Sequence, residues 1–251
     1  MTIDMTGKVV LLTAATSGIG TAIARRLAEA NATIALHYHA DKAGALRLAK
    51  LAGRGSRAFR ADLGDARQVE RLFRDVAKAY PRIDVLINNA GVFLRSPIAD
   101  HRRWLAGWQA TLNVNLLAAG ILSARCVEHF TRQGGGRIVH IASRAAFRGD
   151  GADYLAYAAS KGGMVALSRS IARAFGKRNI TSFVIAPGYV RTAMTERYLR
   201  EVGERQAVRE LALPRLTEPD DVAPTAVFLA SGLMDHATGC VIDINAGSYV
   251  R

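Results

Sequence analysis

Short apolar runs alternate with longer helical patterns along the whole of this chain of 251 residues. The first run, residues 8–14, leads through a glycine-containing turn into a helical pattern that carries Ile23 and Leu27. Further strands are expected at residues 32–38, 56–60, 83–87, 137–142, 181–186 and 240–244. Helices are expected at residues 41–53, 65–79, 101–133 and 153–178, and from residue 219 onward. This alternation is typical of parallel strands joined by crossover helices, so it predicts one α/β domain over residues 1–251.

The turn after the first apolar run has the composition of a phosphate-binding loop. It covers residues 15–20, Ala-Thr-Ser-Gly-Ile-Gly, and opens directly into the next helix. Because Gly18 and Gly20 have no side chain, the backbone there can approach a pyrophosphate, and the free amides of the helix N-terminus meet its charge. The turn therefore predicts a dinucleotide site that includes Ser17 and Ile19.

The end of the second expected strand lacks the acidic residue that would bind a free ribose 2′-hydroxyl. The sequence runs Leu-His-Tyr-His-Ala-Asp-Lys over residues 36–42, so a 2′-phosphate would meet Tyr38, His39 and Lys42. NADP(H) is therefore expected in preference to NAD(H), which is the second candidate cofactor. For Lys42 the alternative is a solvated position at a helix start.

Asp62 and Leu63 follow the third expected strand. A carboxylate at the carboxyl end of a strand can cap the next helix or bind the adenine, and Asp62 can do both. The two residues are therefore candidate cofactor contacts.

Three polar side chains near the middle of the chain form a candidate catalytic group. Tyr157 and Lys161 lie four residues apart in an alanine-rich helical pattern, so the phenol and the ammonium share one helix face. Because a nearby cation favours the phenolate, Lys161 is expected to lower the pKa of Tyr157, which then acts as general acid or base. Ser143 closes an apolar strand at its carboxyl end, where it can hydrogen-bond a carbonyl oxygen. The alternative is an ordinary amphipathic helix, on which this Tyr–Lys spacing is common.

Composition argues against several classes of protein. Cys126 and Cys240 have no metal-ligand spacing and the six histidines form no paired motif, so neither a disulfide framework nor a metal site is expected. No apolar run reaches the roughly 18 residues of a membrane helix, and no secretory signal is found, so a cytoplasmic protein without a membrane partner is expected. The net charge of +13 is spread along the chain without a nucleic-acid-binding motif, so no nucleic acid is expected as partner.

Six motifs occur in order along the chain. They are Thr13-x-x-x-x-Gly18-Ile19-Gly20, Asn88-Asn89-Ala90-Gly91, Val114-Asn115-Leu116, Ser143, Tyr157-x-x-x-Lys161 and Pro187-Gly188-Tyr189-Val190-Arg191-Thr192. Together they resemble the short-chain dehydrogenase/reductase family over essentially the whole chain. The resemblance implies a Rossmann fold, a doubly wound parallel sheet with helices on both faces. It also implies an NAD(P)-dependent oxidoreductase for a carbonyl or alcohol, a substrate lid at about residues 191–216, and a homodimer or homotetramer.

The resemblance further implies a catalytic tetrad of Asn115, Ser143, Tyr157 and Lys161. In the mechanism of that family, Tyr157 exchanges a proton with the substrate oxygen and Ser143 steadies the substrate. Lys161 lowers the phenol pKa and holds the nicotinamide ribose, while Asn115 supports a water that relays protons to Lys161. Tyr157 and Lys161 are thus cofactor contacts too, and the others implied are Thr13, Ser17, Gly18, Ile19, Gly20, Asn89, Ala90, Gly91, Pro187, Gly188, Val190 and Thr192.

One residue departs from the family pattern. Ala14 occupies a turn position that is usually glycine. Its methyl group would crowd the turn slightly at negative φ and more severely at positive φ. The departure is expected to affect cofactor affinity and not the ability to bind cofactor.

Four side chains border the expected cleft: Arg144, Arg148, Tyr154 and Tyr189. They favour a polar or anionic substrate, with solvated loop residues as the alternative.

A basic stripe is expected on the helix that carries Tyr157. Arg169, Arg173 and Lys177 recur every four residues within a segment, from Asp153 to Glu196, that has no acidic residue inside it. The stripe is expected to extend into a basic patch near the cleft mouth through Arg125, Arg132 and Arg178. Similar 3-oxoacyl-carrier-protein reductases dock an acidic carrier on basic residues in this region. Acyl carrier protein is therefore a candidate partner, and reduction of 3-oxoacyl-[acyl-carrier-protein] is the second candidate function. The alternative interpretation of the patch is an ordinary solvated basic face. The alternative function of another class is a catalytically inactive dinucleotide-binding regulator.

Overall fold

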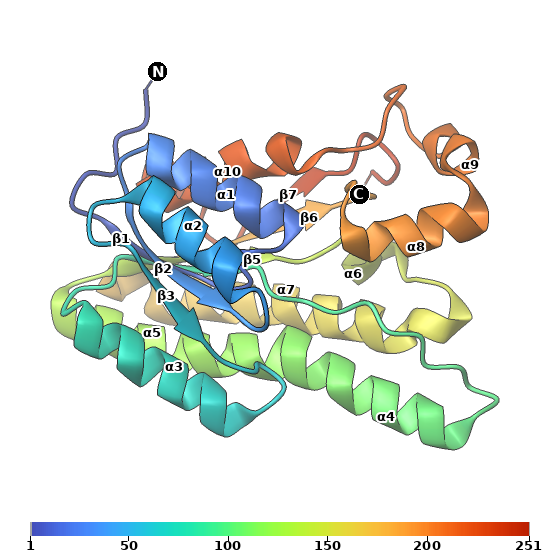
Figure 1. Cartoon of the computed structure of the whole chain (residues 1–251), viewed down its shortest axis with the longest axis horizontal. Coiled ribbons are helices and arrows are strands. Elements are labelled where there is room, and N and C mark those ends of the chain that lie inside the picture. Colours follow the sequence, from blue (N-terminus) through green and yellow to red (C-terminus); the bar gives the residue numbers. More distant parts are fainter. Residues whose placement is uncertain (1, 251) are drawn as a thin grey trace.

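Seven parallel strands form a single sheet in the order β3-β2-β1-β4-β5-β6-β7 (Figure 1). The computed structural model describes residues 2–250, apart from the side chains of residues 197, 198, 201 and 202. The strands are β1 Val9–Leu12, β2 Thr33–Tyr38, β3 Arg57–Arg60, β4 Val85–Asn88, β5 Gly136–Ile141, β6 Ile180–Pro187 and β7 Val241–Ile244. The strand order reverses between β1 and β4, and in open α/β sheets ligands bind beyond the carboxyl ends of the strands at such a point. The predicted doubly wound parallel sheet is confirmed.

Helices cover both faces of the sheet. They are α1 Gly18–Glu29, α2 Lys42–Ala52, α3 Ala66–Ala79, α4 His101–Leu112, α5 Ala118–Gln133, α6 Ala145–Arg148, α7 Leu155–Phe175, α8 Ala193–Val202, α9 Glu204–Arg209 and α10 Pro219–Ser231. In Figure 1, α1, α2 and α10 lie on one face, and α3, α4, α5 and α7 lie on the other. The short helices α6, α8 and α9 gather at one end of the sheet (Figure 1).

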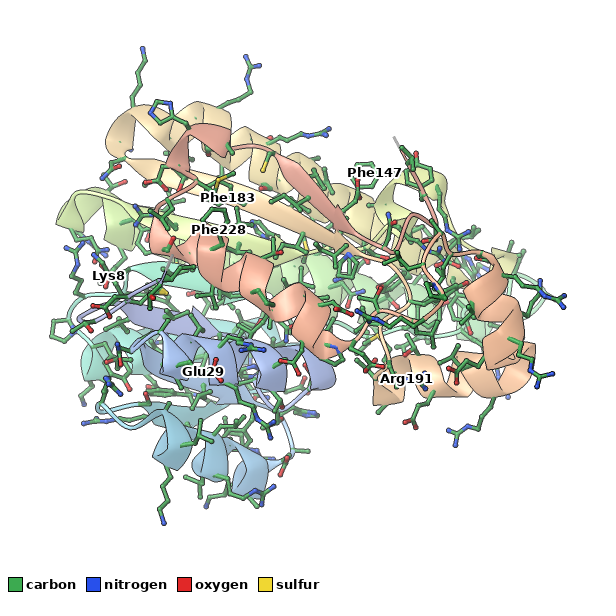
Figure 2. All side chains as sticks on the ribbon, turned by 90° about the horizontal axis from the view of Figure 1, so that it is seen from above. Lys8, Glu29, Phe147, Phe183, Arg191 and Phe228 are labelled. Carbon is green, nitrogen blue, oxygen red and sulfur yellow. The ribbon has the colours of Figure 1, made fainter. Side chains whose placement is uncertain are left out.

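Side chains of the apolar strands pack into two main hydrophobic cores, one on each face of the sheet. Val10 and Leu12 pack in the core that includes α1 and α10, whereas Leu11 packs in the core that includes α3 and α5. Successive strand side chains point to opposite faces, so a strand covered on both sides is apolar at every position. Phe183 of β6 is fully buried in the first of these cores (Figure 2).

α4 and α5 are two parts of one continuous helical stretch. They are joined by a π-helical turn, Asn113–Leu117. A π-turn widens the backbone hydrogen bonding by one residue and is frequently found at functional sites. Here it contains Asn115, which is completely buried.

The stretch His101–Gln133 is long and apolar enough, by length and composition alone, to cross a membrane. The sequence analysis predicted no such segment because it considered uninterrupted apolar runs, whereas this window reaches a mean hydropathy of 1.4 with polar residues inside it. Leu122, Cys126 and Phe130 from this stretch are buried in the core beneath the sheet. A core helix meets the same criterion, and that packing makes it the better interpretation.

Residues 191–216 fold around a small core of their own, formed by Leu199, Ala207 and Leu216. Arg191 stands where this segment leaves the body of the domain (Figure 2). Its guanidinium contacts Glu218 at 2.9 Å and also pairs with Glu204 of α9. The segment is therefore anchored at its base, and its role as a substrate lid stays a prediction.

Candidate active site

The glycine turn brings the backbone of α1 close to neighbouring segments. A Cβ on Gly18 would lie 2.7 Å from Cγ2 of Thr192, and a Cβ on Gly20 would lie 2.1 Å from the carbonyl oxygen of Ala14. Ser17 caps the helix, since its Oγ accepts a hydrogen bond from the N–H of Gly20 at 3.1 Å. These contacts leave room only for glycine, and the amides at the start of this 12-residue helix suit the charge of a pyrophosphate.

Ala14 adopts the left-handed conformation, with φ of +49°. Nδ1 of His37 accepts a hydrogen bond from the N–H of Ala14 at 3.0 Å, and Nε2 lies 3.1 Å from the carbonyl oxygen of Ala61. Burial lowers the pKa of His37 to about 4, so its ring is neutral and Nε2 carries the donated proton. The sequence analysis missed His37, although a histidine within an otherwise apolar strand was a signal that its ring has fixed partners.

Thr13 and Asn89 fasten the glycine turn to the end of β4. Thr13 Oγ1 accepts the N–H groups of Asn89 at 2.9 Å and Ala90 at 3.0 Å. Asn89 Nδ2 donates to the carbonyl of Thr13 at 3.0 Å and to Oγ of Ser17 at 3.2 Å. Both side chains are buried, so the structure uses them to shape the turn.

The residues expected to read the adenosine ribose differ in exposure. Tyr38 is 7% exposed, whereas His39 and Lys42 are open to solvent at the end of β2. The carboxylate of Asp41 is directed at the start of α2, where it accepts the N–H of Gly44 at 2.8 Å. His39 and Lys42 are therefore the accessible members of the predicted group.

The prediction that Asp62 caps the next helix is wrong. Asp65 lies directly before α3 and accepts the N–H of Arg67, so it is the cap. Asp62 instead closes the preceding turn by accepting the N–H of Gly64 at 2.8 Å. Leu63 is 6% exposed, and contact of either residue with a cofactor stays a prediction.

An open cavity joins the glycine turn to the candidate catalytic group. The predicted residues that line it are Ser17, Gly18, Ile19, Asn89, Gly91, Ser143, Tyr157, Lys161, Pro187, Gly188, Val190 and Thr192. The predicted residues outside its lining are Thr13, Gly20, Tyr38, His39, Lys42, Asp62, Leu63, Ala90 and Asn115. Ala14 and Thr16, which belong to the glycine turn, also line it. The lining residues that the sequence analysis missed are Ile141, Ala142, Ala193, Met194 and Thr195.

Burial raises the pKa of Tyr157 to about 12, which the hydroxyl of Ser143 opposes and the charge of Asp150 reinforces. The expectation that Lys161 lowers this pKa is wrong for this structure. Its Nζ lies 5.9 Å from the centre of the Tyr157 ring and donates to the carbonyl of Ile141 at 2.8 Å. Tyr157 is therefore a protonated phenol at neutral pH.

Lys161, which lines the cavity, and His140 are both buried. Lys161 is 3% exposed, and burial lowers its pKa to about 8, so its ammonium is mostly protonated at neutral pH. Burial and the charge of Lys161 lower the pKa of His140 to about 3, so His140 is neutral. The pair carries a single positive charge on the side of the cavity.

Asn115 connects the π-turn to two other segments. Its Oδ1 accepts the N–H of Val92 at 2.8 Å, and Nδ2 donates to the carbonyl of Val92 and to Oγ of Ser160, both at 3.0 Å. Ser160 in turn donates to the carbonyl of Tyr157 at 2.7 Å. Asn115 thus positions the helix that carries Tyr157, and its role in a proton relay stays a prediction.

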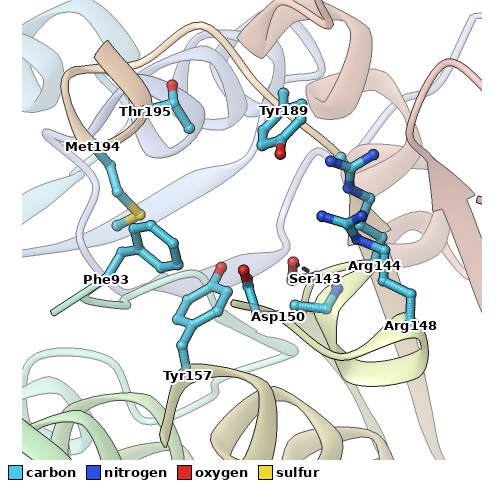
Figure 3. Close-up of a pocket in the computed structure, with 11 residues that line it drawn as sticks. Phe93, Ser143, Arg144, Arg148, Asp150, Tyr157, Tyr189, Met194 and Thr195 are labelled. Carbon is cyan, nitrogen blue, oxygen red and sulfur yellow. Dashed lines mark hydrogen bonds between the residues drawn. The ribbon is translucent and has the colours of Figure 1, made fainter. Parts of the chain in front are cut away.

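A second, smaller cavity opens beside Tyr157 (Figure 3). Arg144, Arg148 and Tyr189 line it, as expected for residues that border the cleft. Tyr154 does not line it but stacks on Phe93, with ring centres 3.9 Å apart. This cavity is therefore lined mainly by residues that do not contribute to the predicted cofactor site.

The basic stripe lies away from the cleft, contrary to expectation. Arg169 follows Tyr157 by twelve residues on α7, which at about 1.5 Å per residue is about 18 Å along the axis. The stripe continues toward the amino end of β6, whereas Ser143 stands at the carboxyl end of β5. Arg125 is also neutralised, since it contacts Glu70 at 2.9 Å and Glu128 at 3.0 Å.

Comparison with known proteins agrees with this geometry. A family model described as enoyl-(acyl carrier protein) reductase matches residues 13–248. The 3-oxoacyl-[acyl-carrier-protein] reductase of Aquifex aeolicus is 31% identical, over 99% of this chain and 100% of that protein. The 2-dehydro-3-deoxy-D-gluconate 5-dehydrogenase of Pseudoalteromonas atlantica is 34% identical, over 97% of this chain and 96% of that protein.

A solved structure is similar over nearly its whole length. It is a putative NAD(P)-dependent gluconate 5-dehydrogenase from Beutenbergia cavernae with bound NADP at low occupancy, with a TM-score of 0.89 and 35% identity over 99% of both chains. The present chain belongs to the short-chain dehydrogenase/reductase family. It is an NAD(P)-dependent oxidoreductase of that family.

Proposed function

We propose that this protein transfers a hydride between NADP(H) and a small carbonyl or secondary alcohol substrate, with Tyr157 as general acid and base. The observation that carries the proposal is that Ser143, Tyr157 and Lys161 line the same cavity as the glycine turn. The bound nicotinamide supplies or accepts the hydride. The protein supplies the proton, the position of the substrate oxygen and the pyrophosphate cradle.

Tyr157 and Ser143 act on the substrate oxygen. The phenol is protonated at neutral pH, so in reduction it donates its proton to the carbonyl oxygen, and in oxidation it recovers that proton. Ser143 Oγ accepts the N–H of Ala145 at 3.1 Å, and its hydroxyl, which lies beside Tyr157, can donate to the same substrate oxygen. Two donors thus meet the oxygen on which negative charge develops.

Lys161 has the position and the donors to hold a ribose. Its ammonium has three N–H donors, and one of them is used by the carbonyl of Ile141. The remaining donors serve a ribose hydroxyl and a proton relay supported by Asn115.

NADP(H) is the proposed cofactor, with NAD(H) as the weaker one. His39 and Lys42 are exposed where a 2′-phosphate would lie, and the neighbouring Asp41 is engaged as a helix cap. The similar structure from Beutenbergia cavernae contains NADP. We also propose a cytoplasmic homodimer or homotetramer.

A spectrophotometric assay at 340 nm tests the proposal. Purified protein is supplied with NADPH and a panel of ketones, or with NADP⁺ and the matching alcohols. Turnover that depends on Tyr157 supports the oxidoreductase. Tight binding of NADPH without turnover of any compound would instead support an inactive dinucleotide-binding regulator. The presence of Ser143, Tyr157 and Lys161 together argues against a regulator, because such a protein does not need a catalytic group.

The second candidate function is 3-oxoacyl-[acyl-carrier-protein] reduction. It is favoured by the 31% identity to the Aquifex aeolicus enzyme. Docking of an acidic carrier on Arg169 and Arg173 would make the rate fall as salt rises, because screening shortens from about 30 Å at 0.01 M to about 10 Å at 0.1 M. Equal rates for the acyl carrier and a short thioester analogue, in wild type and in Arg169→Glu/Arg173→Glu, would remove this candidate.

A further inference from the structure

The cavity on the substrate side of Tyr157 has two poles of opposite charge. Asp150 lies beside Tyr157 and Ser143, whereas Arg144 and Arg148 lie together on the wall near Tyr189 (Figure 3). The remaining lining is largely uncharged and includes Phe93 and Met194. A ligand in this cavity therefore meets a carboxylate near the reacting centre and guanidinium groups farther along the wall.

The guanidinium of Arg144 is buried and incompletely satisfied. The residue is 3% exposed, and Cζ of its guanidinium lies over the ring of Tyr189, 4.0 Å from the ring centre. Nη2 donates to Oε2 of Glu210 at 3.4 Å. Nη1 is buried and has no hydrogen-bond partner among the side chains that the structure describes. Unsatisfied buried donors are rare in native proteins, and a charged one is especially unfavourable. Arginine and carboxylate match in geometry, so Arg148, which is exposed, together with the neighbouring Arg144 can bind a carboxylate in the cavity.

Asp150 is the second recognition group. Its Oδ1 accepts the N–H of Gly151 at 2.8 Å, and its charge acts on Tyr157. Burial raises the pKa of Asp150 from its ordinary value, although Arg148 and Arg144 oppose that shift. A partly buried carboxylate beside the proton donor is suited to accept hydrogen bonds from hydroxyl groups next to the reacting carbon.

We propose that the substrate is a small hydroxylated carboxylate, whose carboxylate binds at Arg144 and Arg148 and whose hydroxyl neighbouring the reacting carbon donates to Asp150. This inference rests on the proposed function, since it names the substrate class of the same site. Long acyl chains, which carry neither a carboxylate nor several hydroxyls, do not use these groups.

The test measures binding in a protein that cannot turn the ligand over. The Tyr157→Phe variant, saturated with NADP⁺, is titrated calorimetrically with D-gluconate, with D-glucitol, which lacks the carboxylate, and with hexanoate, which lacks the hydroxyls. D-Gluconate is expected to bind at least ten times more tightly than either. Adding Arg144→Gln should reduce the affinity for D-gluconate to that for D-glucitol, and adding Asp150→Ala should reduce it to that for hexanoate.

Arg137 provides the matched control. It is partly buried near the amino end of β5, away from the cavity, and its guanidinium pairs with Asp235 at 2.6 Å. Arg137→Gln should therefore lower the melting temperature without changing the affinity for D-gluconate. Arg144→Lys should recover part of the affinity, because the charge remains. If D-gluconate binds no better than D-glucitol, or if Arg144→Gln changes only the melting temperature, the substrate class is wrong.

The outcome is separable from that of the proposed function. Turnover of neutral ketones together with equal binding of all three ligands would overturn this inference and leave the oxidoreductase standing. Selective binding of D-gluconate without any NADP-linked turnover would support the carboxylate site and overturn the proposed function.

Discussion

The imidazole of His37 holds the amide of Ala14 in a left-handed turn, through a hydrogen bond of 3.0 Å. An alanine at positive φ is strained, and the bond from a rigid, buried ring compensates for part of that strain. The same ring reaches the carbonyl of Ala61, so one side chain of β2 connects the segments that follow β1 and β3. The glycine turn is therefore supported from beneath by a histidine that no nucleotide motif includes.

Ala14→Gly should stabilise the protein by about 1 kcal/mol, because glycine adopts positive φ without the steric penalty of a methyl group. Chemical denaturation of the two proteins measures the difference in the free energy of unfolding. Ala61→Gly serves as the control, since this alanine is not among the residues with positive φ, and it should destabilise. A less stable Ala14→Gly protein would show that the methyl group packs favourably enough to outweigh the backbone strain.

Stability should fall as the pH drops below about 6.5. His37 and His140 have folded-state pKa values of about 4 and about 3, below the ordinary value of 6.5. The unfolded chain therefore takes up protons first, and each histidine contributes stability above pH 6.5 that is lost progressively at lower pH. By pH 5 the loss is roughly 2 kcal/mol for each histidine.

Denaturation curves from pH 7.5 to 5 measure this loss. His37→Asn keeps an acceptor for the amide of Ala14 and should flatten the pH dependence. His236→Gln, at an exposed position, should leave the dependence unchanged. If the free energy of unfolding depends on pH equally in His37→Asn and in the wild type, the loss of stability at low pH does not come from His37.

Tyr157→Phe should reduce turnover by about 10²–10⁴-fold while NADPH still binds, because only the transferable proton is lost. Tyr80→Phe is the matched control. Tyr80 donates to the carbonyl of Gly55 at 2.7 Å, so its loss should reduce the free energy of unfolding by about 1 kcal/mol and leave turnover intact. Comparable turnover in Tyr157→Phe and Tyr80→Phe would remove Tyr157 from the mechanism.

NADPH should be preferred over NADH by at least about tenfold in kcat/KM, which is about 1.4 kcal/mol. His39→Asp should reverse the preference, since a carboxylate repels a 2′-phosphate and accepts hydrogen bonds from a free ribose. The exposed His39 is a better position for this test than the buried Tyr38, where an introduced carboxylate would lose its solvation. Wild-type preference for NADH would contradict the assignment of the 2′-phosphate to this corner.

The fold could be predicted from the sequence because strands and helix starts leave patterns within short segments of the chain. Continuous apolar runs such as Val9–Leu12 reveal strands buried on both faces, and the glycine turn reveals where the first helix begins. The bounds of α3 were predicted to within one residue, but the capping residue was not: Asp65, and not Asp62, caps this helix. Either aspartate fits a helix start, and only the path of the turn between them decides.

The site was predictable as a group of residues but not in its electrostatics. Motif spacing marks Tyr157 and Lys161, yet the direction of the lysine depends on the carbonyl of Ile141, which belongs to another strand. Likewise, Arg144 and Asp150 stand on either side of the short helix α6, and nothing in the local sequence shows that they line the same cavity. Such features arise from three-dimensional packing, so sequence patterns do not contain them.

The π-helical turn at Asn113–Leu117 also limits how the long helix can be altered. Deleting one residue there would restore regular α-helical hydrogen bonding, yet it would rotate everything beyond the deletion by about 100° relative to what precedes it. Leu122 and Phe130 would then leave the core, or Asn115 would turn away from Val92. The extra residue of the π-turn thus sets the rotation of α5 about the helix axis relative to α4. Homologues or designed variants that retain both contacts must retain the irregular turn as well.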